Sequence, residues 1–93
     1  MLVTTVDIAG LPCEIHRVRM KSHDGLCYSQ RMAGDKGIRI NSDLKGRALV
    51  ETIIHEILHR ADYDKTELWV AHVAERCADV LFTPPFDELL EHV

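Results

Sequence analysis

Residues 51–63 read ETIIHEILHRADY and lie within a longer window of regularly spaced apolar residues. Over the wider window 44–61, apolar residues recur at the i, i+3, i+4, i+7 spacing that places side chains on one face of an α-helix. The window therefore predicts an amphipathic helix from about Leu44 to about Ala61. Ser42 and Asp43 are the candidates for its N-cap. The residues of the apolar stripe are Val50, Ile53, Ile54, Ile57, Leu58 and Ala61.

The same stretch contains an H-E-x-x-H pattern, formed by His55, Glu56 and His59. Two histidines four residues apart on a helix lie one turn apart on the same side, where both imidazoles can reach one Zn²⁺. The glutamate between them is then placed to hold and deprotonate a metal-activated water. The pattern predicts a zinc site with Glu56 as general base. The alternative is an ordinary helix whose two histidines face solvent or form hydrogen bonds.

A second helix is expected from Glu67 to about Phe82, and Pro84-Pro85 ends it. Thr66 is the candidate N-cap, and a capping box formed by Asp64 with Glu67 is the rival. Its expected apolar stripe is Val70, Val73, Ala74, Cys77 and Leu81.

A peptidase zinc site needs a third protein ligand, and acidic or histidine residues after His59 can supply it. We favour Glu67 because it precedes Val70 and Ala74 by three and seven residues, so it shares the apolar stripe, where a carboxylate requires a partner. The full set of candidates is Asp62, Asp64, Glu67, His72, Glu75 and Asp79, with His72 and Glu75 as the main alternatives. Asp62, three residues after His59, can accept a hydrogen bond from a ligand imidazole and fix its tautomer. It can equally be an ordinary acid in a turn.

The first half of the chain has the alternating pattern of strands. Strands are expected over residues 3–8, 13–20, 26–32 and 38–41, with a hairpin signal at 34–37 between the last two. We therefore expect one α+β domain over residues 1–93. Its small antiparallel sheet, of three to four strands at the N-terminus, packs on two C-terminal helices, the first of which contains the H-E-x-x-H pattern.

From residue 38 onward the order of segments is IRINSDL, then ETIIHEILHRADY, then ELWVAHVAERCADVL. This order resembles the minimal gluzincin-like zinc metallopeptidases carried by phages and prophages, distant relatives of the ImmA/IrrE-type peptidases that cut repressors. The resemblance covers roughly residues 26–83. The H-E-x-x-H pattern is its specific part, and the second helix matches the family's E-x-x-A-x-x-F-A pattern only loosely.

The resemblance implies a zinc metalloendopeptidase with His55, His59 and Glu67 as ligands and Glu56 as general base. It also implies that the strand containing Ile38, Arg39 and Ile40 is the edge strand above the metal. A peptide or protein substrate would add there as an extra β-strand. The connection from His59 to Glu67 is shorter than in the larger members. No tyrosine or histidine is obviously placed to stabilise an oxyanion, although Tyr63, His72, Tyr28, Arg39 and Asn41 are candidates. A non-catalytic zinc-stabilised module that binds a protein partner is the alternative function, and a strictly specific or autoinhibited enzyme is a third.

Composition limits the other classes of function. Apolar residues make up 46% of the 93 residues and charged residues 28%, which is typical of a globular chain. The formal net charge of −4 argues against a nucleic-acid partner. No segment approaches the ~20 apolar residues of a membrane span, and the N-terminus does not resemble a signal peptide. Three cysteines without a C-x-x-C pair favour reduced thiols and a cytoplasmic location.

Overall fold

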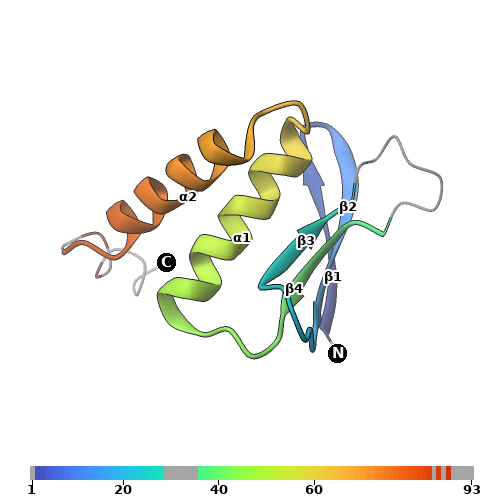
Figure 1. Ribbon diagram of the computed structural model, residues 1–93, viewed down its shortest axis with the longest axis horizontal. Coiled ribbons are helices and arrows are strands. Elements are labelled where there is room, and N and C mark those ends of the chain that lie inside the picture. The colour runs from blue at the N-terminus through green and yellow to red at the C-terminus, as the bar shows by residue number, and fades with distance from the viewer. Residues whose placement is uncertain (1, 29–35, 85, 87, 89–93) are drawn as a thin grey trace.

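The computed structural model describes residues 2–28, 36–84, 86 and 88, and it shows an α+β fold. Four strands at the N-terminus form one sheet, and two C-terminal helices pack beside it (Figure 1). The strands are β1 (Leu2–Ile8), β2 (Leu11–Val18), β3 (Gly25–Cys27) and β4 (Ile38–Asn41), and the helices are α1 (Gly46–Ala61) and α2 (Glu67–Leu81).

The sheet is mixed, with the strand order β1-β2-β4-β3. β1 and β2 form an antiparallel hairpin whose two-residue turn, Ala9-Gly10, has positive φ at both residues, as a type I′ turn requires. β4 then pairs parallel with β2 and antiparallel with β3. The expectation of a wholly antiparallel sheet is therefore wrong at the β2–β4 pair. After β2 the chain first forms β3 at the edge of the sheet, and β4 then fills the place between β2 and β3. Because β4 runs antiparallel to β3, it runs parallel to β2.

The core lies between the sheet and α1. Ile8, Cys13, Ile38 and Ile40 are buried in the sheet, and side chains of α1 and neighbouring segments pack on them. The packing residues are Ile15, Cys27, Leu44, Leu49, Ile53 and Ile57. α1 therefore has a fixed position on the sheet, and the position of α1 sets that of its histidines.

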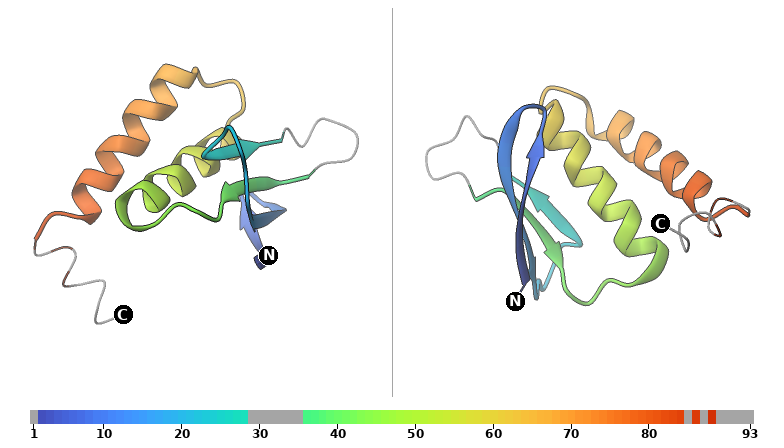
Figure 2. Two further views of the ribbon diagram at one scale, coloured as in Figure 1. Left: turned by 60° about the horizontal axis from the view of Figure 1, so that its bottom comes forward. Right: turned by 180° about the vertical axis from the view of Figure 1, so that it is seen from behind.

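α2 runs back alongside α1 and packs on α1 alone among the described elements (Figures 1 and 2). Its buried residues Val70, Ala74 and Ala78 are small or β-branched, which allows the two helices to approach closely. Cys77, expected in this stripe, is exposed. None of the described helices is long and apolar enough to cross a membrane.

The ends of the helices were predicted with mixed success. α1 ends at Ala61 as expected, but it begins at Gly46, with Lys45 as an N-cap that makes no side-chain hydrogen bond. Ser42 and Asp43 lie earlier, in a turn where the Asn41 side chain accepts a hydrogen bond from the Asp43 N–H. The N-cap of α2 is Thr66, as expected, and not Asp64. Three expected features fall partly outside the described residues. They are the strand beyond residue 28, the first half of the hairpin at 34–37 and most of a final helical turn near residues 86–92.

Candidate metal centre

His55 and His59 lie one turn apart on α1, and both side chains are half-buried. Their ring centroids are 4.9 Å apart, with the planes inclined by 61°. Ile53 and Ile57, which alternate with them along the helix, pack toward the sheet. The histidines are therefore held on a helix whose other side is anchored in the core, so their separation is fixed by helix geometry.

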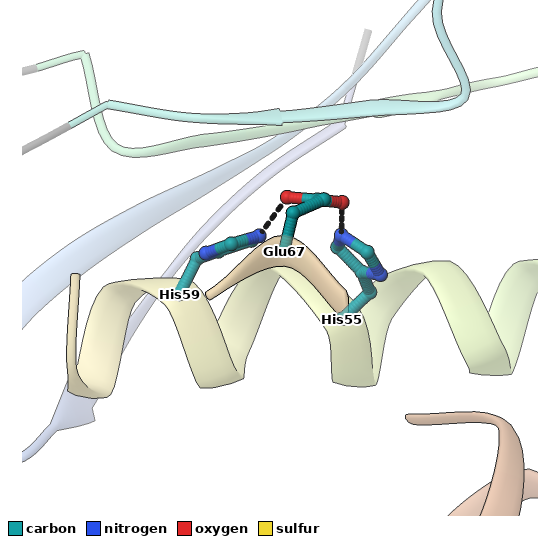
Figure 3. A group of neighbouring side chains, drawn as sticks. All are labelled: His55, His59 and Glu67. Atoms are coloured by element: carbon teal, nitrogen blue, oxygen red, sulfur yellow. Dashed lines mark hydrogen bonds and ion pairs between the residues drawn. The ribbon is translucent and has the colours of Figure 1, made fainter. Parts of the chain in front are cut away.

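Glu67 bridges the two imidazoles (Figure 3). Its Oε1 lies 2.7 Å from Nε2 of His55, and its Oε2 lies 2.6 Å from Nε2 of His59. The short 62–66 connection turns the chain back, and Thr66 begins α2 by accepting a hydrogen bond from the Trp69 N–H. Glu67 is thereby the first residue of α2, beside the two histidines.

The reason given from sequence for choosing Glu67 was wrong. We expected its carboxylate in the buried stripe of α2, but its side chain is 72% exposed. Glu67 reaches the histidines because the helical hairpin turns its first residue toward α1. Desolvation acts to raise the pKa of the Glu67 carboxyl. The hydrogen bonds from His59 and His55 and the charges of both imidazoles act in the opposite direction, and together they lower this pKa.

His55, His59 and Glu67 form a group that could hold a metal ion, because their ligand atoms all lie within 4.8 Å of one another. It is the one such group of three or more among the described residues. His72 and Glu75, the alternative third ligands, are exposed on α2 and do not belong to it. The Asp62 carboxylate accepts a hydrogen bond from the Asp64 N–H (3.2 Å), and within the described chain it makes none to either imidazole. Its expected role beside the ligands stays a prediction.

Glu56 is buried beside this group, with 6% of its surface exposed. Burial raises the pKa of its carboxyl, and the nearby charge of Glu67 adds to this, while His55 and His59 act in the opposite direction. Its Oε1 lies 3.8 Å from Nε2 of His55, beyond hydrogen-bond distance. A buried carboxylate with a raised pKa next to a possible metal site is a candidate proton acceptor.

A pocket of about 450 Å³ opens over the three metal-site candidates and Glu56. One wall is the strand β3, and the opposite wall is the start of α2 with the connection before it. Tyr63 stands at this end, its ring centroid 6.4 Å from that of His59. The lining residues are Gly25, Leu26, Cys27, His55, Glu56, His59, Tyr63, Lys65 and Glu67.

The strand beside the pocket is β3 and not β4. Residues Ile38, Arg39 and Ile40 were expected to form an edge strand, but β4 pairs with β2 on one side and β3 on the other. A strand paired on both sides has no backbone groups left for an added peptide, and Ile38 and Ile40 point into the core. The sequence did not single out Gly25 and Lys65 as site residues, because the Asp24-Gly25 pair signals only a turn.

No protein-family model matches the chain, and comparisons with curated proteins and with solved structures found no match. The function proposed below therefore rests on the residues of the site.

Proposed function

We propose that the chain is a zinc-dependent metallopeptidase that hydrolyses peptide bonds. The observation that supports this most directly is the cluster of His55, His59 and Glu67 with the buried Glu56 next to it, in one pocket. Two imidazoles and one carboxylate are the donor set of a catalytic zinc site, which leaves a fourth position for water.

The donor atoms fit an ion of this size. Zinc held tetrahedrally at ~2.0–2.1 Å spaces its ligand atoms about 3.3 Å apart. The Nε2-to-Oε distances of 2.7 and 2.6 Å are somewhat shorter, and Glu67 is an exposed side chain that can withdraw by this amount. A bound zinc ion would lower the pKa of a water toward ~7 and polarise a carbonyl group.

Glu56 supplies the proton transfers. Its carboxylate lines the pocket, and its raised pKa makes it a better base at neutral pH than an exposed glutamate. It accepts a proton from the attacking water as the oxygen adds to the scissile carbonyl carbon. It then donates that proton to the leaving amine as the C–N bond breaks. Tyr63 and Lys65 are the donors lining the far end of the pocket, where a developing negative charge needs support.

The substrate is a peptide or protein segment that aligns along β3. Pairs 24–41 and 28–37 are hydrogen-bonded between β3 and β4, so by the alternation of antiparallel pairs the N–H and C=O of Gly25 face away from β4. Gly25 also lines the pocket, which puts this edge beside Glu56. An extended peptide can add to such an edge through main-chain hydrogen bonds. The three cysteines, Cys13, Cys27 and Cys77, contain no C-x-x-C pair, which accords with a cytoplasmic location.

The test combines metal content with turnover. Purified wild-type chain should contain one zinc ion and cleave members of a peptide library, and a chelator should abolish cleavage. Glu56→Gln should keep the metal and lose cleavage, whereas Glu67→Gln should lose metal affinity. Asp7→Asn, which removes one charge on the distant strand β1, is the matched control and should change neither.

Two results would contradict the proposal. If the chain binds no zinc, both the enzyme and the metal site are excluded. If it binds zinc through these residues but cleaves nothing, while zinc removal unfolds it, the chain is instead a zinc-stabilised module that binds a protein partner.

A further inference from the structure

A second pocket, of about 320 Å³, adjoins the first. The two share Gly25, His55 and Glu56, so the second pocket borders the candidate metal centre at His55. The second pocket extends toward the beginning of α1, between α1, α2 and the start of β3. Its lining is completed by Asp24, Glu51, Thr52, Ala71 and Glu75.

The ionisable side chains that line this pocket are acidic, apart from His55. Asp24, Glu51 and Glu75 contribute three carboxylates, none of which makes an ion pair or a hydrogen bond within the described part of the chain. No lysine or arginine lines it. Arg47 approaches Glu75, but its guanidinium contacts the backbone oxygen of that residue at 3.3 Å and is paired with the Asp79 carboxylate.

These carboxylates do not form a second cation site. Among the described residues, ligand atoms converge within metal-binding distance only at the His55, His59 and Glu67 group. The carboxylates of the second pocket are instead spread around a space roughly ten times the ~30 Å³ share of one water. The Thr52 and Ala71 side chains supply apolar wall between the charges. A long side chain with an apolar stem and a cationic end matches this lining.

Glu56, the proposed general base, also faces this pocket. It is 6% exposed, lines the second pocket as well as the first, and makes no hydrogen bond among the described residues. The one ion-pair contact given for its carboxylate among the described residues is His55 Nε2 at 3.8 Å, so a cation that arrives through the pocket would add a closer compensating partner. A cation seated there faces Glu56 as well as the three carboxylates at the rim.

We propose that the second pocket receives a lysine or arginine side chain of the substrate, so that the chain cleaves peptide bonds close to a basic residue. This rests on the proposed peptidase function and names its substrate class. Since both pockets share His55 and Glu56, the basic residue lies within about two positions of the scissile bond, given ~3.4 Å per residue of an extended peptide. Lys65, at the far end of the first pocket, disfavours a second basic side chain there.

The test compares two fluorescein-labelled nonapeptides that differ only at the central residue, lysine in one and glutamine in the other. Binding is measured by anisotropy on the zinc-loaded Glu56→Gln chain, which does not turn over and keeps the carboxylates of Asp24, Glu51 and Glu75. Cleavage is measured on the wild type, which also has the Glu56 charge. We expect the lysine peptide to bind and react at least 10-fold better. Glu51→Gln and Glu75→Gln, made separately in each background, should each reduce this preference by about 2–5-fold, the effect of one partly exposed ion pair.

Asp7→Asn is the control, because it changes the net charge equally but lies on β1, at the opposite edge of the sheet from β3. Its side-chain oxygen can still accept the Gly10 N–H. Cleavage without a preference for lysine would overturn the inference and leave the peptidase function intact. So would a preference that Asp7→Asn reduces as much as Glu51→Gln does. Binding that prefers lysine without any cleavage would overturn the peptidase function and support the pocket.

Discussion

Replacing Gly25 with alanine tests how closely β3 is packed on α1 above Glu56. A Cβ added at this position would lie 2.8 Å from Cγ2 of Thr52 and 3.0 Å from Cγ of Glu56, both closer than ordinary van der Waals contact. The Arg39 backbone oxygen on the neighbouring strand, 3.4 Å away, limits movement in the other direction. Alanine therefore has to displace the edge strand or the two helix side chains.

The cost can be estimated from measured effects of overpacking. An extra methyl group forced into a packed site typically destabilises a protein by ~1–3 kcal/mol. For a domain of this size each kcal/mol lowers the melting temperature by about 4–8 °C, so Gly25→Ala should lower it by roughly 5–20 °C. Because the displaced side chains include Glu56 but none of the three metal-site candidates, peptide turnover should fall while zinc affinity changes little.

The assay is a double-mutant cycle followed by thermal unfolding. Thr52→Ser removes the Cγ2 atom that makes the shortest contact, so it should recover part of the stability lost in Gly25→Ala. We expect a coupling energy of at least ~0.5 kcal/mol between the two positions, as is usual for residues in contact. An alanine variant as stable as the wild type would refute this packing. So would a loss of stability that Thr52→Ser leaves unchanged.

Three further predictions concern the site and its supports. Burial raises the Glu56 pKa, so the folded wild type loses stability as pH rises through that pKa and the buried carboxyl ionises. In the presence of a chelator, Glu56→Gln should therefore melt at a higher temperature than the wild type, by a margin that grows from pH 4 to pH 8. A margin that stays constant over this pH range would contradict the prediction. Thr66→Ala removes the acceptor for the Trp69 N–H, so the free energy of unfolding measured in thermal scans should fall by ~1 kcal/mol. Zinc affinity measured by calorimetry should fall as well. Thr66→Ser keeps the hydroxyl and should retain both values. Zinc at 100 times its dissociation constant should raise the free energy of unfolding of the wild type by ~2.7 kcal/mol and leave that of His59→Ala unchanged. If thermal scans show the same stabilisation of both proteins, zinc does not bind at this site.

The positions of the helices could be read from sequence because they depend on neighbouring residues. The periodic apolar stripe placed α1 and α2 to within two residues at each end, and the spacing of His55 and His59 alone put both on one side of α1. The hydroxyl of Thr66 could cap only the helix directly after it. At the other helix the same reasoning failed, because Ser42 and Asp43 were already held in the turn after β4.

Strand order and the placement of Glu67 could not be read in the same way. The pattern of Ile38 and Ile40 indicates a strand with one buried face, but that face is the same whether the strand is at the edge or inside the sheet. The exposed carboxylate of Glu67 lies at the histidines because α2 folds back on α1. The apolar spacing had suggested that Glu67 belongs to the buried face of α2, but the buried residues of this helix are Val70, Ala74 and Ala78.

Local spacing is enough to specify the two helices, the pair of histidines one turn apart and the glutamate between them, since each depends on contacts between residues close in the chain. Tertiary contacts specify that β3 is the edge strand, that Glu67 joins the histidines, and that carboxylates from the residue before β3, from α1 and from α2 line one pocket. These features depend on pairing and packing between distant segments, which local spacing does not specify.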